Sequence, residues 1–133
     1  MKNLILPILF FIISFFVLKD YFNNKRNDLE NNPKYTICRI KSTFYMRGAH
    51  FLTYYYFVNN KKQDGQFIVK GRCGAMIGKY YIVKYQKNKP SNSKVLCDKY
   101  ITNSQISIPK NGWDTIPDTL RLKEVPEECR CNW

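Results

Sequence analysis

The sequence is poor in the side chains that catalysis commonly uses. His50 is the single histidine, and residues 35–105 contain only two carboxylates, Asp64 and Asp98. General acid–base catalysis needs titratable groups placed together, and a nucleophile needs a base beside it. The one adjacent pair of carboxylates, Glu127–Glu128, lies near the C-terminal end. We therefore predict that the protein is not an enzyme and has no catalytic residues.

The cysteines lack the C-x-x-C spacing that is typical of zinc knuckles and thioredoxin-like sites. There are five of them, so at least one is unpaired within a monomer: Cys38, Cys73, Cys97, Cys129 and Cys131. In an oxidising compartment, one of the first three would pair with a tail cysteine. Alternatively, Cys38 and Cys97 are small buried apolar residues. We predict neither a metal site nor a cofactor.

Charge is missing from one long stretch, Leu4–Leu18, which contains a single hydroxyl, Ser14. Extended to Phe22, this run is long enough to approach the ~30 Å hydrocarbon core of a bilayer. A cleaved signal peptide is the alternative, but no small-x-small cleavage motif follows Leu18. A buried core helix is a third interpretation. We predict a transmembrane signal-anchor over residues 1–22.

The side of the membrane that carries the rest of the chain is weakly encoded. Lys19, Lys25 and Arg26 follow the apolar run, and the positive-inside rule would keep the domain in the cytoplasm. A short N-terminal tail before a short apolar run is instead typical of a secretory signal. We expect a single-pass protein of the bacterial inner (cell) membrane with an exported domain.

The folded part begins after a polar linker, residues 23–34. Residues 35–105 form a small basic β domain in which apolar residues recur at every second position, as in half-buried strands. Within it, Cys38, Ile40, Phe44 and Met46 share one predicted face, and Phe51 to Val58 should be buried on both faces. A hairpin turn is predicted at residues 59–62, where asparagine tolerates positive φ.

Five such strands with short turns predict a mainly β fold, namely an SH3- or OB-like barrel or a curled antiparallel sheet. The remaining residues, 106–133, contain prolines at intervals of eight or nine and several apolar residues. We predict that this tail is extended and packs on the domain with Trp113 docked.

The domain is strongly basic. Residues 35–105 hold 13 lysines and arginines against two acids, in a chain of net charge +12. Such a surface attracts anionic lipid headgroups, acidic polymers or nucleic acid, although membrane attachment makes nucleic acid an unlikely partner. The alternative is ordinary solubilising charge. The candidate interaction surface consists of Arg39, Lys41, Arg47, Lys61, Lys62 and Lys84.

Two consecutive motifs resemble a family of short, uncharacterised bacterial membrane proteins with a small β domain of unknown function. The first is the aromatic hairpin Tyr54–Lys62, with Asn60 where that group usually has glycine, and the second is Gly78–Ser93. The resemblance covers roughly residues 35–97 and implies a small barrel. It implies no activity.

These observations favour a membrane-tethered, non-enzymatic interaction module whose partner is an envelope protein or anionic headgroups. Two alternatives stay open. One is a redox- or metal-responsive protein built on the five cysteines. The other is a small immunity-type membrane protein.

Overall fold

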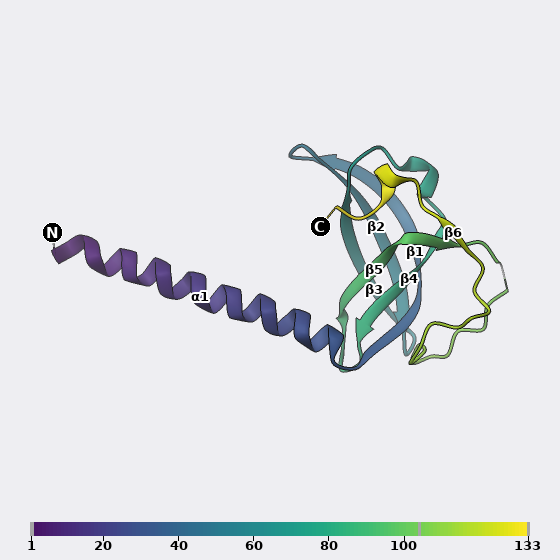
Figure 1. The fold of residues 1–133 in the computed structure, drawn as a ribbon, viewed down its shortest axis with the longest axis horizontal. Coiled ribbons are helices and arrows are strands. Elements are labelled where there is room, and N and C mark those ends of the chain that lie inside the picture. The colour runs from purple at the N-terminus through teal and green to yellow at the C-terminus, as the bar shows by residue number, and fades with distance from the viewer. Residues whose placement is uncertain (1, 104, 133) are drawn as a thin grey trace.

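The computed structural model describes residues 2–103 and 105–132, with side chains from Leu6 onward. A long helix, α1 (Lys2–Glu30), leads into a sheet of six antiparallel strands in the order β3-β2-β1-β4-β5-β6 (Figure 1). Two short 3-10 helices, η1 (Gly74–Met76) and η2 (Glu127–Cys129), complete the elements. The strands are β1 (Pro33–Met46), β2 (Ala49–Val58), β3 (Lys61–Val69), β4 (Tyr80–Gln86), β5 (Lys89–Ile101) and β6 (Leu122–Glu124). The predicted fold class, an N-terminal apolar helix followed by a mainly β domain, is confirmed.

The helix is long and apolar enough to cross a membrane within Leu6–Glu30, where an 18-residue window has a mean hydropathy of 1.6. It also continues through residues 23–30, so most of the segment expected to be a polar linker, residues 23–34, is helical. This segment contains neither proline nor glycine, and Leu29 is buried against the sheet at 6% exposure. The helix ends because Asn32, at φ 127°, precedes Pro33, and a residue before proline disfavours helical geometry.

The core lies on the inner, concave face of the sheet. Alternate residues of β1 and β2 point into it, as the period-two pattern predicts: Cys38, Ile40, Leu52, Tyr54, Tyr56 and Val58. The expectation that β2 is buried on both faces is wrong, because Phe57 on its other face is 54% exposed. An antiparallel sheet can keep one face in water, and β2 does so here.

The far half of β1 also differs from the prediction. A β-bulge between Ile40 and Ser42 shifts the strand register, so Phe44 and Met46 do not follow Cys38 into the core. Met46 is 49% exposed, and Phe44 stacks on Phe51 at 4.9 Å between ring centroids.

The turn between β2 and β3 is confirmed in shortened form. Asn59 and Asn60 both have positive φ, 51° and 63°, as a two-residue type I′ hairpin requires. The paired residues Val58 and Lys61 flank it, so β3 begins two residues earlier than a turn over residues 59–62 would allow.

The sheet is curled but does not close into a barrel, since its two edges are β3 and β6. The C-terminal segment lies against the free edge of β3 instead. Val69 and Cys131 form an antiparallel bridge, and the Asn132 amide donates to the Ile68 carbonyl at 2.8 Å. We call the gap between β3 and β5 the seam, and this segment covers one end of it.

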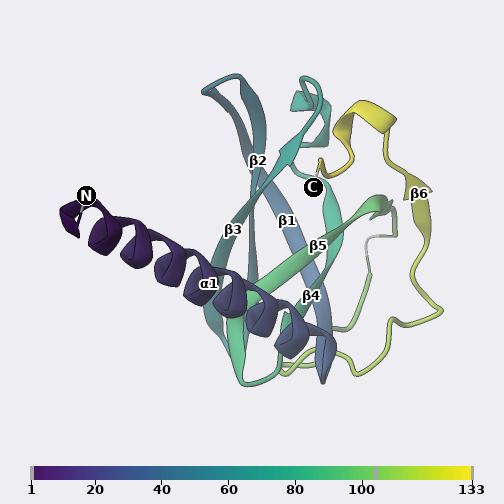
Figure 2. The same ribbon diagram turned by 60° about the vertical axis from the view of Figure 1, so that its left-hand side comes forward.

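The rest of the tail covers the outer face of the sheet (Figure 2). Trp113 pairs with Tyr35 of β1 through two backbone hydrogen bonds, of 2.7 and 2.8 Å. A second apolar cluster forms beneath the tail, from Ile82, Ile101 and Leu120 with Tyr35, Ile37, Leu96 and Ile106 packed against it. The tail therefore packs on the domain.

Candidate functional site

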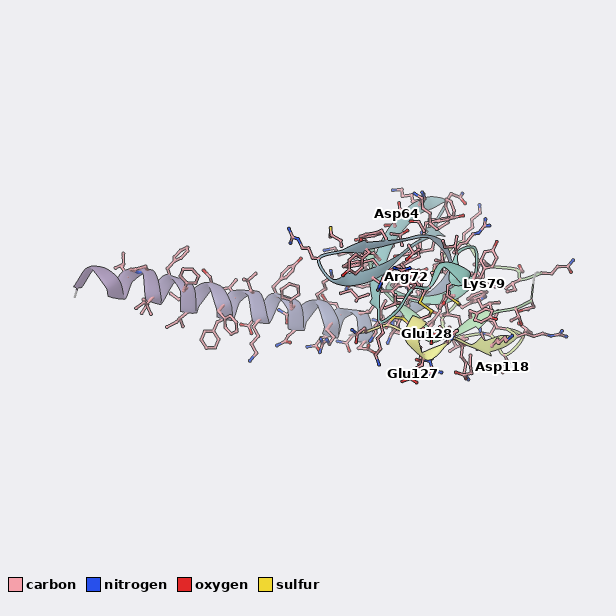
Figure 3. The ribbon with its side chains drawn as sticks, turned by 90° about the horizontal axis from the view of Figure 1, so that it is seen from above. Asp64, Arg72, Lys79, Asp118, Glu127 and Glu128 are labelled. Carbon is pink, nitrogen blue, oxygen red and sulfur yellow. A yellow bond between two sulfur atoms is a disulfide. The ribbon has the colours of Figure 1, made fainter. Side chains whose placement is uncertain are left out.

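Two disulfides join the tail to the body of the domain (Figure 3, sulfur in yellow). Cys73, before η1, is bonded to Cys129 in η2, and Cys97 of β5 is bonded to Cys131. Their Cα–Cα distances are 5.6 and 5.5 Å, within the range that disulfides adopt. Both bridges lie at the seam.

Cys38 is the cysteine without a bridge, and it is fully buried in the core. Burial raises the pKa of its thiol far above the ordinary range, because an apolar interior disfavours the charged thiolate. A thiol held neutral and away from solvent is unreactive. Cys38 is therefore a small buried apolar residue, as the alternative interpretation of the sequence expected. Cys97 is also buried, but it is bonded to Cys131.

The described residues contain no group of three or more histidine, cysteine, aspartate or glutamate side chains that could hold a metal ion. His50 lies at the start of β2, where its ring contacts that of Tyr45 at 4.8 Å between centroids.

The outer face of β1 to β4 carries basic groups interleaved with aromatic rings. The Arg39 guanidinium lies 5.7 Å from the centroid of the Tyr80 ring, and the Lys62 ammonium lies 5.1 Å from that of Tyr55. Arg39 is paired with Tyr55 across β1 and β2, so the two cation–π contacts are adjacent. We call this set, with Phe57, the basic–aromatic face.

The six predicted surface cations are not brought together. Arg39 and Lys62 belong to the basic–aromatic face, and Lys41 is exposed nearby at the bulge of β1. Arg47 lies before β2 and Lys61 after it, at opposite ends of that strand. The sixth, Lys84, forms an ion pair with Glu30.

Lys84 belongs to a set of contacts between the helix and the domain, and these contacts were not predicted from the sequence. Leu29 is buried, the Lys84 ammonium pairs with the Glu30 carboxylate, and the Asn92 side-chain amide donates to the Lys25 carbonyl at 2.9 Å. We call these contacts the helix junction. They hold the last turns of α1 against β4 and β5, so the helix and the sheet form one body.

Comparison with known proteins adds no relative: no protein-family model, no curated protein and no solved structure matches the chain. The resemblance of Tyr54–Lys62 and Gly78–Ser93 to small bacterial membrane proteins therefore stays a prediction. We therefore infer a function from the disulfides, the basic–aromatic face and the helix junction.

Proposed function

We propose that the protein is a single-pass protein of the bacterial inner membrane that displays an exported, non-enzymatic binding domain. The observation that carries this proposal is the pair of disulfides between the body and the tail. Disulfides persist in oxidising compartments such as the periplasm and the cell surface, and are rare in the cytoplasm. The apolar helix before the domain supplies the anchor.

The partner that we propose is an acidic protein or polymer of the envelope, bound at the basic–aromatic face. Arg39 provides positive charge, and Lys62 adds to it although its ammonium also lies 3.5 Å from the Asp64 carboxylate. The neighbouring rings provide flat apolar surface that remains partly accessible, with Phe57 54% exposed. A positive surface steers a negatively charged partner toward it and improves the fit once they meet. The excess of bases over acids in residues 35–105 acts in the same direction.

The disulfides are also what a redox-responsive protein would need. Burial favours a structural role, since Cys73, Cys129 and Cys97 are 1%, 4% and 6% exposed and Cys131 is half-buried. Bridges that regulate or catalyse are typically strained or exposed. In the function that we propose, the two bridges hold the tail in place and do not exchange.

Topology is tested with a C-terminal epitope tag in intact spheroplasts and in a lysed control. An exported domain predicts that added protease removes the tag from intact spheroplasts. A tag that is protected until lysis would place the domain in the cytoplasm and contradict the proposal.

Binding is tested with the full-length chain in nanodiscs of neutral lipid, with dextran sulfate as the polyanion probe. The variant Arg39→Gln/Lys62→Gln should weaken binding severalfold, and added salt should weaken binding by the parent chain. The matched control, Arg121→Gln/Lys123→Gln, removes the same charge from the exposed tail and β6. Equal losses in the two variants would show that only net charge matters and would refute the assignment of this face.

A further inference from the structure

The tip of the β1–β2 hairpin exposes apolar and aromatic side chains with no core beneath them. We call residues 45–49 the hairpin tip, because they lie beyond His50–Val69, the last pair that joins β2 to β3. Within it, Tyr45 is 63% exposed, Met46 is 49% exposed, and Arg47 makes the turn at φ 51°. No carboxylate occurs between Glu30 and Asp64. Tyrosine, methionine and arginine without acids form the composition that suits the boundary between water and lipid.

The hairpin tip lies on the side of the domain that faces the N-terminal end of the helix. β1 starts at the end of α1 and leads back, so that the tip lies level with the second half of the helix and not beyond its end (Figures 1 and 2). The helix junction holds this arrangement through Leu29 and the Glu30–Lys84 ion pair. The direction of the hairpin relative to the helix is thus set by packing and not by a flexible linker.

The position of a bilayer around α1 follows from its length. About 20 residues of helix cross the ~30 Å hydrocarbon core, so a span that starts near the N-terminus ends close to Phe22. The eight residues from there to Glu30 rise only about 12 Å, and the headgroup layer takes up about half of that. Whatever lies level with the second half of the helix is therefore at the membrane surface or just inside it.

We propose that the hairpin tip is a second membrane contact, which inserts Tyr45 and Met46 among the headgroups of the leaflet that the helix leaves. Arg47 then meets lipid phosphates, with which its guanidinium forms paired hydrogen bonds. The exposed tip is small for a protein partner, since stable protein interfaces bury more than about 1,000 Å². A lipid surface needs no such matching area. This inference rests on the membrane anchoring described under the proposed function.

The test uses the full-length chain in vesicles of phosphatidylglycerol and phosphatidylcholine, with an environment-sensitive NBD label at one introduced cysteine. The parent carries Cys38→Ala, which removes the unpaired thiol. Labels are placed by Met46→Cys in the hairpin tip, by Asp118→Cys in the exposed tail as the matched control, and by Phe15→Cys in the helix. Lipids with a doxyl quencher near the top of the acyl chain report contact with the bilayer.

We expect the label at residue 46 to emit at shorter wavelength than the label at residue 118 and to lose emission to doxyl lipid. An additional Tyr45→Asp substitution should reduce this quenching, because a carboxylate is costly at the apolar boundary. Water-like emission at residues 46 and 118, with quenching at residue 15, would overturn the second contact and leave the anchor intact. Blue-shifted emission at residue 46 without quenching would show that protein covers the hairpin tip, and this would also overturn the inference.

An absence of quenching at residue 15 would show a different failure. It would mean that the helix does not enter the bilayer, and the anchoring part of the proposed function would fall together with the second contact.

Discussion

Loss of either bridge to the tail should cost the domain a large part of its stability. Cys73–Cys129 and Cys97–Cys131 join residues 56 and 34 positions apart in the sequence. Closing loops of these lengths lowers the chain entropy of the unfolded state by amounts worth about 4.2 and about 3.8 kcal/mol at 25 °C. Typical domains are stable by only about 5–15 kcal/mol. Each single-bridge variant should therefore be marginally folded, and the variant without either bridge should release the tail from the seam.

The assay is urea unfolding of the full-length chain in detergent micelles, followed by tryptophan fluorescence, which includes Trp113 in the tail. The variants Cys73→Ala/Cys129→Ala and Cys97→Ala/Cys131→Ala should each lose about 4 kcal/mol of unfolding free energy. Their combined loss should be smaller than the sum, because the two loops overlap in sequence. Cys38→Ala is the control that changes the core but leaves both bridges in place.

Thiol counting gives a second readout of the same prediction. The unreduced native chain should have no thiol that reacts with maleimide, because Cys38 is fully buried. Denaturation without reductant should expose one thiol, and denaturation with reductant should expose all five cysteines. Three or more reactive thiols in the unreduced, denatured chain would refute the reasoning, as would a variant without bridges that is as stable as the parent.

Three further results are expected. Gly112→Ala should lower the unfolding free energy by about 1–3 kcal/mol, because Gly112 has φ +69° and a Cβ there would overlap the Tyr85 hydroxyl. The control Gly74→Ala should leave the unfolding free energy unchanged, because a Cβ at Gly74 meets open space. Leu29→Asp should remove about 2 kcal/mol of apolar burial and make residues 23–34 of the chain in vesicles sensitive to protease. The control Asn27→Asp, on the exposed side of the helix, should leave these residues resistant. Burial raises the pKa of four tyrosines, so the domain should lose stability as the pH rises above 10, where the unfolded chain ionises first. The increase in absorbance at 295 nm that comes from ionisation of Tyr54, Tyr56, Tyr81 and Tyr85 should therefore occur together with the loss of circular dichroism signal. Ionisation of these four tyrosines before any loss of structure would contradict this.

The strands were predictable because their side chains alternate. One face of β2 is buried from Leu52 to Val58 at every second residue, and the turn after it carries the two asparagines that positive φ favours. The far end of β1 was not predictable, because the bulge after Ile40 changes the register without any glycine or proline to mark it. The bulge is defined by the register between β1 and β2, which the sequence of β1 alone does not encode.

The helix junction escaped prediction for a similar reason. Residues 23–30 are polar apart from Leu29, which is buried against a surface that exists only once the sheet has folded. The sequence indicated that disulfides to the tail could form, but it did not indicate which cysteines pair, since five cysteines allow many combinations. The adjacent cations of the basic–aromatic face could be identified only once Arg39 and Tyr55 were known to be paired across two strands.

In the membrane arrangement that we propose, the helix junction also couples the orientation of the domain to that of the helix. β1 is 14 residues long, so the hairpin tip lies at most about 45 Å from the point where the helix stops. Transmembrane helices tilt to match the thickness of their bilayer, and a change of about 10° would move the tip by at most about 8 Å. Because the helix junction packs the end of α1 against β4 and β5, we expect the depth of the hairpin tip to follow the tilt of the helix. If both membrane contacts that we propose exist, a difference in membrane thickness would change how deeply the hairpin tip enters the headgroup layer.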